Sequence, residues 1–200
     1  MNIHSVSATT SLPESSEKRD AIFVAALELF AERGFHGVAV PEIAQKAKVG
    51  AGTIYRYFPS KEALVNALYQ HHKHELAGHF LTGLDLNGPP RAVFKSFWAR
   101  ACDLARTRPK VVEFLELHHH APYLDAKSRE IEEQLLGTAA MFINHAIQQQ
   151  VFKDVQPAVL MCVVWGSFRA LIQGGCDRRL VLDEATCAQA EQCLWEAIRR

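Results

Sequence analysis

This sequence lacks a net charge, a long uncharged apolar run and a secretory leader pattern. Its 22 Lys and Arg residues balance 22 Asp and Glu residues, so any attraction to nucleic acid must come from a local basic patch. The most apolar uncharged stretch, residues 155–168, is shorter than the about 20 residues that a membrane-spanning helix needs. The N-terminus has no basic segment followed by an apolar run. We therefore expect no transmembrane helix, no membrane partner and a cytoplasmic location.

The sequence also has little that indicates an enzyme. Its five cysteines are an odd number and form no C-x-x-C pair, so we expect buried apolar thiols. It has no G-x-S-x-G, no glycine-rich phosphate loop and no H-E-x-x-H. His118, His119 and His120 are conspicuous, but adjacent residues of a helix diverge by about 100° and cannot all reach one ion. We expect no enzyme activity, no cofactor and no metal; a His-dependent hydrolase is the alternative.

What the sequence does contain is helical periodicity over most of its length. Residues 1–15 are rich in Ser and Thr without such periodicity, so a mobile arm is predicted there. Ser15 or Ser16 is expected to cap the first helix, and Gly34 to end it in a left-handed conformation. No later stretch alternates with period two for long enough to demand a strand, so the predicted fold class is all-α with about nine helices. The apolar stripe of the first helix has the spacing i, i+3, i+4, i+7, i+8 and comprises Ile22, Ala25, Ala26, Leu29 and Phe30.

Two short helices are predicted next, over residues 41–48 and 51–58, with a glycine-containing turn between them. Ser60 is expected to cap a longer helix that begins at Lys61. Two short helices joined in this way form a helix-turn-helix, whose second helix enters the major groove of DNA. The segment 43–61 contains four basic residues and no acidic one, a local charge of +4, from Lys46, Lys48, Arg56 and Lys61. This is the local patch that the neutral composition requires.

A resemblance to a known family rests on three segments in this region. They read Ala26-x-x-Leu29-Phe30-Ala31-Glu32-x-Gly34-Phe35, then Ile43-Ala44-x-x-Ala47-x-Val49, then Gly52-Thr53-Ile54-Tyr55-x-Tyr57-Phe58-x-Ser60-Lys61-Glu62-x-Leu64. Together they resemble the N-terminal signature of TetR-type transcriptional regulators. The resemblance implies a homodimeric repressor that binds a pseudo-palindromic DNA operator and is released by a small-molecule effector. A ligand-insensitive DNA-binding dimer stays open as an alternative.

The resemblance also implies which residues meet DNA. Lys61 would bind phosphate, while Ile54 and Phe58 are expected in the core. Two departures from the family remove hydroxyl groups: Val38-Ala39 precedes the second helix, and Gly50 stands at the start of the third. The domain division implied is a helix-turn-helix domain over residues 16–62 and a helical ligand-binding and dimerisation domain over 63–200. The residues expected to contact bases or backbone are Gly50, Ala51, Thr53, Tyr55, Arg56 and Tyr57.

Two apolar stripes near the C-terminus predict a dimer interface. They lie on helices expected over residues 157–173 and 183–199, and two such helices from each subunit can form a four-helix bundle. Burial of either stripe within its own subunit is the alternative. The interface residues predicted are Leu160, Val164, Phe168, Leu171, Ala190, Leu194 and Ile198.

An effector pocket is predicted from the aromatic and imidazole side chains of residues 90–151 and the helix that follows. Pockets are typically apolar with a few convergent polar groups, although core filling is the alternative for each aromatic. The effector is expected to be apolar or aromatic. The predicted pocket residues are Phe94, Phe97, Trp98, Phe114, His118, His119, Tyr123, Phe142, His145, Trp165, Phe168 and Arg169.

Overall fold

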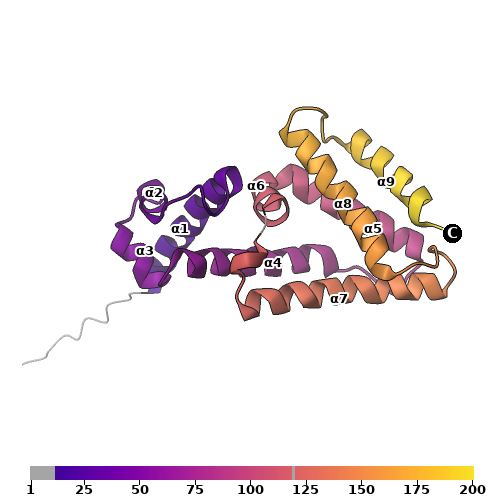
Figure 1. The fold of residues 1–200 in the computed structure, drawn as a ribbon, viewed down its shortest axis with the longest axis horizontal. Coiled ribbons are helices and arrows are strands. Elements are labelled where there is room, and N and C mark those ends of the chain that lie inside the picture. The colour runs from indigo at the N-terminus through magenta and orange to yellow at the C-terminus, as the bar shows by residue number, and fades with distance from the viewer. Residues whose placement is uncertain (1–11, 119) are drawn as a thin grey trace, which may run out of the picture. The chain divides into compact units, whose positions relative to one another are not determined.

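The computed structural model describes residues 12–118 and 120–200 (Figure 1). Within these ranges the chain forms nine α-helices and no strand, which confirms the predicted fold class. The chain divides into two compact units, one up to residue 65 and one over residues 66–200. The predicted division between residues 62 and 63 stays a prediction, because helix α4, Lys61–Leu81, runs through it without a break.

The first helix of the N-terminal unit is α1, Leu12–Arg33. It begins before the predicted cap, so the prediction of an unstructured arm was wrong for residues 12–15; residues 1–11 lie outside the described part of the chain. Proline is favourable in a first helical turn because its missing N–H would be unpaired there anyway, and Pro13 occupies that turn. The Ser16 hydroxyl lies 3.5 Å from the Asp20 carboxylate instead of capping the helix.

The end of α1 agrees with the prediction. Gly34 has a φ of 66°, and its N–H donates to the carbonyl of Phe30 at 2.9 Å. Phe35 then turns back so that its ring stacks on Phe30, with 6.3 Å between centroids. This left-handed stop sends the chain toward α2.

Helix α2, Val40–Lys46, has no capping side chain at its N-terminus, and a residue within the helix takes over part of that role. Its N-cap is Ala39, whose N–H donates to the Glu42 carboxylate at 2.8 Å, and Arg33 pairs with the same carboxylate at 2.8 Å. The helix ends before the predicted residue 48 because Lys48 is left-handed, with a φ of 57°. The N–H groups of Val49 and Lys48 donate to the carbonyls of Ala44 and Gln45, which closes the turn.

Helix α3, Ala51–Tyr57, follows, with Gly50 as an N-cap that offers no side chain. Ser60 caps α4 as predicted, because its hydroxyl accepts from the Ala63 N–H at 3.1 Å. Ile54 and Phe58 are buried, as expected, and Phe58 stacks on Phe23 of α1 at 5.6 Å. The inner face of α3 therefore holds it to α1, and its outer face is left at the surface.

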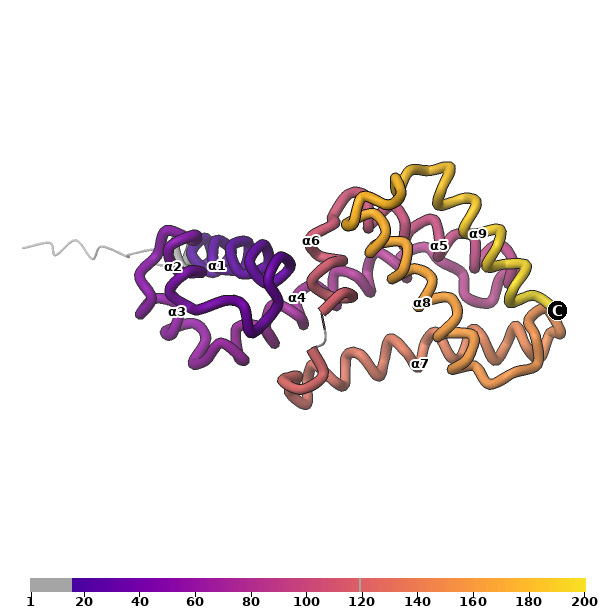
Figure 2. Tube along the Cα trace, turned by 45° about the horizontal axis from the view of Figure 1, so that its top comes forward, coloured from indigo at the N-terminus to yellow at the C-terminus, as the bar shows by residue number. Residues whose placement is uncertain are grey.

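The C-terminal unit consists of the rest of α4 and a set of longer helices. Three of these helices begin at a proline, and the helix predicted over residues 157–173 extends to Cys176. α5 packs on α9, and α7 packs on α8 (Figure 2). The elements are α5 (Pro90–Thr107), α6 (Pro109–Val112), a π-helical turn (Glu113–Leu117), a 3₁₀ turn (Ala121–Tyr123), α7 (Ala126–Gln148), α8 (Pro157–Cys176) and α9 (Glu184–Ile198).

Candidate nucleic-acid interface

The outer face of α3 collects the predicted DNA-contact residues other than Lys61. Tyr55 is 51% exposed, Gly50 and Arg56 are also exposed, and the other members are partly exposed; Gly52, which was not among them, is exposed as well. The Arg56 guanidinium lies over the Tyr57 ring, 5.2 Å from its centroid. The helix thus presents a phenol, a guanidinium and a stretch of uncovered backbone at the surface of the unit.

The basic patch is smaller in the structure than in the sequence. Lys46 forms an ion pair with Glu28 at 2.7 Å, which neutralises its charge locally. Lys48 and Arg56 are exposed and form no ion pair within the described residues. These two cations, together with Lys61, whose hydrogen bonds go to neutral carbonyls, carry the remaining positive charge of the segment 43–61.

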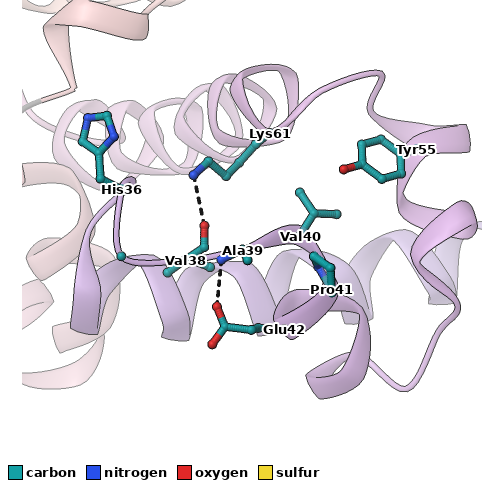
Figure 3. Close-up of a pocket in the computed structure, with 9 residues that line it drawn as sticks. His36, Val38, Ala39, Val40, Pro41, Glu42, Tyr55 and Lys61 are labelled. Atoms are coloured by element: carbon teal, nitrogen blue, oxygen red, sulfur yellow. Dashed lines mark hydrogen bonds between the residues drawn. The ribbon is translucent and has the colours of Figure 1, made fainter.

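Lys61 holds the chain that connects α1 to α2. Its Nζ donates to the carbonyl of Val38 at 3.0 Å (Figure 3). It also donates to the carbonyl of Phe35 at 2.9 Å and lies 4.1 Å from the centroid of the Phe35 ring. An ammonium group has three donor protons, so two are committed to this loop. The phosphate contact predicted for Lys61 stays a prediction, and the structure adds a second task for it.

A groove of about 600 Å³ lies beside these residues (Figure 3). Tyr55 turns its hydroxyl toward the groove, and Lys61 reaches across it to the segment that leads into α2. A backbone hydrogen bond from Ala39, together with Arg33, lowers the pKa of Glu42, whose carboxylate is committed to the start of α2. The sequence analysis did not predict this groove, although it singled out Val38-Ala39, which lie in its wall, as a departure from the family. The lining residues are His36, Gly37, Val38, Ala39, Val40, Pro41, Glu42, Tyr55 and Lys61.

Gly52 has no role in the fold that would require glycine. A Cβ placed on it would meet nothing within 4 Å, and its φ is not positive. Glycine inside a helix costs about 1 kcal/mol relative to alanine. The folded protein therefore gives no reason for this glycine, whereas close approach of a partner to the backbone gives one.

Comparison with known proteins identifies the family. Residues 22–68 match the family model described as bacterial regulatory proteins of the tetR family, and residues 69–200 match the tetracyclin repressor-like C-terminal domain. The chain belongs to the TetR family. It is a DNA-binding transcriptional regulator of that family, and the resemblance seen in the sequence is confirmed.

Individual relatives agree with this assignment. The chain is 27% identical to the regulator RutR of Escherichia coli K12 over 157 residues, which cover 76% of this chain and 72% of RutR. It is 34% identical to the regulator YuxN of Bacillus subtilis over 79 residues, which span 40% of this chain and 27% of YuxN. A solved TetR-family structure from Vibrio parahaemolyticus aligns with a TM-score of 0.71 at 27% identity, covering 92% of this chain and 99% of that one.

The TetR-type C-terminal unit does not gather the predicted pocket residues into one cavity. Phe94, Trp98 and Phe114 are buried and fill the core. Trp98 donates its indole N–H to the carbonyl of Cys187 at 2.8 Å. The alternative of core filling therefore describes these aromatics better than a pocket wall.

The polar pocket candidates also lie apart. The Tyr123 hydroxyl is 2.9 Å from the buried His120 imidazole. His145 pairs with Gln149 on the same helix, and Arg169 is exposed. His118 is half-buried, Phe142 packs on Phe152, and His119 lies outside the described residues. These positions correct the prediction that the polar groups converge on a ligand.

One small cavity does occur in this unit, with a volume of about 10 Å³. Trp165 and Phe168 belong to its wall, and Phe97 stacks on the wall residue Phe80 at 4.7 Å. Its polar member, Glu116, was missed from the sequence. The available signal was an acid four residues after Val112, which places both residues on the same helical face, directly after the apolar Phe114 and Leu115. The lining residues are Leu76, Phe80, Leu104, Val112, Leu115, Glu116, Trp165 and Phe168.

The predicted dimer residues separate into two groups. Leu160, Phe168, Leu194 and Ile198 are only 1–7% exposed within the subunit, so burial within their own subunit, the alternative, describes them, and their place at an interface stays a prediction. Val164, Leu171 and Ala190 are partly exposed. The reason is that the apolar stripe of each helix is too wide to face a single neighbour. One part of the stripe packs into the core of the same subunit, and the other part stays at the surface.

Helix α8 nevertheless keeps an exposed apolar face. By length and composition it is the one helix in the described ranges that could cross a membrane, with a mean hydropathy of 1.4, and 22% of that window is buried. The prediction that the chain has no transmembrane helix was based on the uncharged residues 155–168, which are fewer than the residues of α8. Val159 and Val163, which are 48% and 40% exposed, lie in line with the exposed Gly166 and Ala170.

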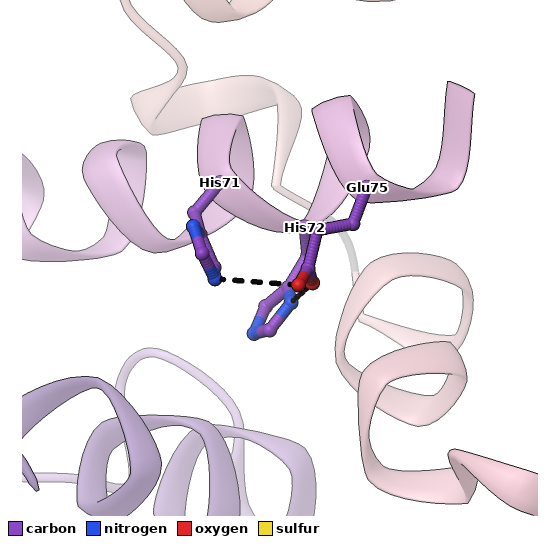
Figure 4. Close-up of side chains that lie close together, drawn as sticks. All are labelled: His71, His72 and Glu75. Atoms are coloured by element: carbon purple, nitrogen blue, oxygen red, sulfur yellow. Dashed lines mark hydrogen bonds and ion pairs between the residues drawn. The ribbon is translucent and has the colours of Figure 1, made fainter. Parts of the chain in front are cut away.

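A histidine cluster on α4 was not anticipated from the sequence. The ligand-type atoms of His71, His72 and Glu75 lie within 4.8 Å of one another (Figure 4). The Arg108 guanidinium donates to Glu75 at 2.7 Å and lies 3.5 Å from His72 Nδ1. The Arg108 guanidinium thus already supplies a positive charge at this cluster, and its contacts connect α4 to the junction of α5 and α6. The predicted absence of a metal stays a prediction.

Proposed function

We propose that this TetR-family regulator is a repressor that binds a pseudo-palindromic operator as a homodimer and is released by a small, apolar or aromatic effector. The observation that carries the proposal is the outer face of α3, with Tyr55 and Arg56 exposed beside an uncovered Gly52. Phosphate contacts position a protein on DNA, and base contacts specify the sequence. Lys48 is suited to the first task, and Arg56 and Tyr55 to the second.

The outward faces of α8 and α9 support a homodimer. A single helix-turn-helix reads too few base pairs to select one site, so two copies are needed. Val159, Val163 and Gly166 on α8 and Ala185 and Ala188 on α9 are exposed and small or apolar. Small side chains allow close packing of helices across a two-fold axis, and a second copy would cover the apolar face that the subunit leaves open.

Helix α4 offers a route for effector response. It begins with Lys61, which holds the loop before α2, and it contributes Leu76 and Phe80 to the small cavity. Ligand pockets have volumes of about 300–1,000 Å³, so the cavity must widen to accept an effector. A ligand that prefers the widened conformation lowers DNA affinity by its differential binding energy.

A titration of purified protein into labelled duplex from upstream of its own coding region tests this proposal by fluorescence anisotropy. We expect one dimer per duplex, with binding that weakens steeply as salt rises. Equal affinity for a scrambled duplex of the same composition would contradict a specific regulator.

A ligand-insensitive DNA-binding dimer is the second candidate, and the small cavity volume of about 10 Å³ favours it. Effector titration against the preformed DNA complex separates the two. Release of DNA by any apolar compound at concentrations that leave the protein folded supports the first candidate. A complex that persists throughout supports the second.

A further inference from the structure

Glu116 is an unusual residue within the C-terminal unit. Its side chain is 10% exposed, and its Oε1 is buried without a hydrogen-bond partner, which is true of no other buried side-chain nitrogen or oxygen in the described residues. Its Oε2 accepts from the Trp165 indole N–H at 2.7 Å. The nearest cation is Lys73, whose Nζ lies 3.5 Å from Oε1, too far for a good hydrogen bond.

Stability does not explain this pair. A buried ion pair is often no more stabilising than apolar residues of the same volume, and an unpaired buried acceptor is costly. Lys73 is itself buried and lies 5.3 Å over the Tyr69 ring. Two charged side chains are therefore kept inside an apolar region, where the Trp165 indole satisfies Oε2 of Glu116 but Oε1 accepts no hydrogen bond.

Their position points to a ligand. Glu116 lines the small cavity together with Phe80, Trp165 and Phe168. It belongs to the π-helical turn Glu113–Leu117. Such turns are rare in proteins as a whole, but those that occur are often found at functional sites. An unfilled acceptor thus sits at the wall of an aromatic cavity, on a backbone segment with an irregular hydrogen-bond pattern.

We propose that Glu116 and Lys73 recognise the head group of the effector, and that this head group is neutral and carries both a donor and an acceptor, as a hydroxyl or a carboxamide does. The inference rests on the proposed ligand-responsive function. Oε1 requires a donor, Lys73 Nζ offers one, and the pair has no net charge. A charged ligand would leave one buried charge uncompensated, whereas a neutral donor–acceptor head satisfies both groups.

Three probes that share an aromatic body test the proposal: benzyl alcohol, benzylamine and benzoate, measured by calorimetry on the full-length protein. Wild type should bind benzyl alcohol about tenfold or more tightly than either ion. Glu116→Gln leaves Lys73 unpaired and should shift the preference to benzoate. Lys73→Met should shift it to benzylamine. Glu113→Gln, on the same turn, is the matched control and should keep the wild-type order.

An unchanged order of affinities in both charge variants would overturn the proposal, as would the failure of all three probes to bind up to their solubility limits. If a single variant does not fold, the double variant Lys73→Met/Glu116→Leu removes both charges and should fold, but bind toluene in preference to benzyl alcohol. Retained preference for the alcohol would also overturn the proposal. Operator binding without ligand should be the same in every folded variant, so its loss would count against the proposed function instead.

Discussion

The two units of this protein place their polar functional groups in opposite ways. The N-terminal unit packs Phe23, Ile54 and Phe58 inside and leaves Arg56 and Tyr55 outside. The C-terminal unit encloses Lys73 and Glu116 inside its apolar interior, where Glu116 lines the small cavity. A long duplex is met by a convex, exposed helix, whereas a small molecule must be surrounded. Under the proposed function, the size of each partner explains which side of the core carries the polar groups.

The largest effect is expected from a charge on the exposed face of α8. Val163→Glu should convert the dimer to a monomer and weaken operator binding by about a hundredfold or more, because the two half-sites no longer bind together. Analytical ultracentrifugation measures the first result and anisotropy the second.

The control is Met141→Glu, at a residue that is 67% exposed on α7, which should stay dimeric. Leu194→Glu, in contrast, should unfold the subunit because Leu194 is buried within it. A folded, monomeric Leu194→Glu variant would show that our division between core and interface is wrong.

Arg56→Ala should weaken operator binding by about five- to a hundredfold and relax the sequence preference, with the dimer intact. Arg106→Ala, at an exposed arginine of the C-terminal unit, is the matched control and should bind as wild type does. Equal losses for operator and scrambled duplex would assign Arg56 to phosphate rather than to bases.

Lys61→Met separates the two tasks of Lys61. Loss of its bonds to the Phe35 and Val38 carbonyls should lower the melting temperature of the protein, since each such bond contributes about 1 kcal/mol. A phosphate contact would in addition reduce the salt slope of DNA binding by about one unit. A variant with unchanged stability and unchanged slope would remove both tasks.

Gly52→Ala should raise the free energy of unfolding by about 0.5–1 kcal/mol and at the same time weaken DNA binding. The added methyl group meets nothing in the protein, so any loss of affinity comes from the partner. Chemical denaturation and anisotropy give the two values. A stabilised variant with full DNA affinity would refute close approach at this point.

The smallest effect concerns pH. Burial lowers the pKa of His72, although the Glu75 carboxylate acts in the opposite direction. The unfolded chain therefore binds this proton more readily, so stability is lost as pH falls through the ordinary histidine value of about 6.5. Between about pH 7.5 and pH 5.5, the melting temperature of His72→Asn should therefore fall less than that of wild type. His74→Asn, at an exposed site, is the control and should follow wild type.

The N-terminal unit could be predicted from sequence because its signals are local. Gly34, Ser60 and the buried Ile54 act within a few residues of their positions, and the structure confirms each. The errors there concern single ends of helices. Ala39 could not be foreseen as a cap, because Glu42 supplies the missing acceptor from the next turn.

The C-terminal unit was predicted less well because burial there depends on contacts between distant helices. Periodicity identified the apolar stripe of α8, but it cannot say which part of a wide stripe the subunit covers for itself. Leu160 and Phe168 turned inward, and Val159 and Val163 outward. Glu116 was overlooked for the same reason, since an acid beside apolar residues becomes informative only when its burial is known.

Hydroxyl-radical footprinting of the protein on its operator tests the central claim most directly. A dimer that presents two copies of α3 to one face of the duplex should protect two half-sites whose centres are about 34–36 Å apart, or about one turn of B-DNA. At a protein concentration that just saturates the wild-type site, Arg56→Ala should weaken both protected segments together. A single protected segment, or protection as strong in the Arg56 variant as in wild type, would contradict the assignment of α3 as the DNA-reading helix.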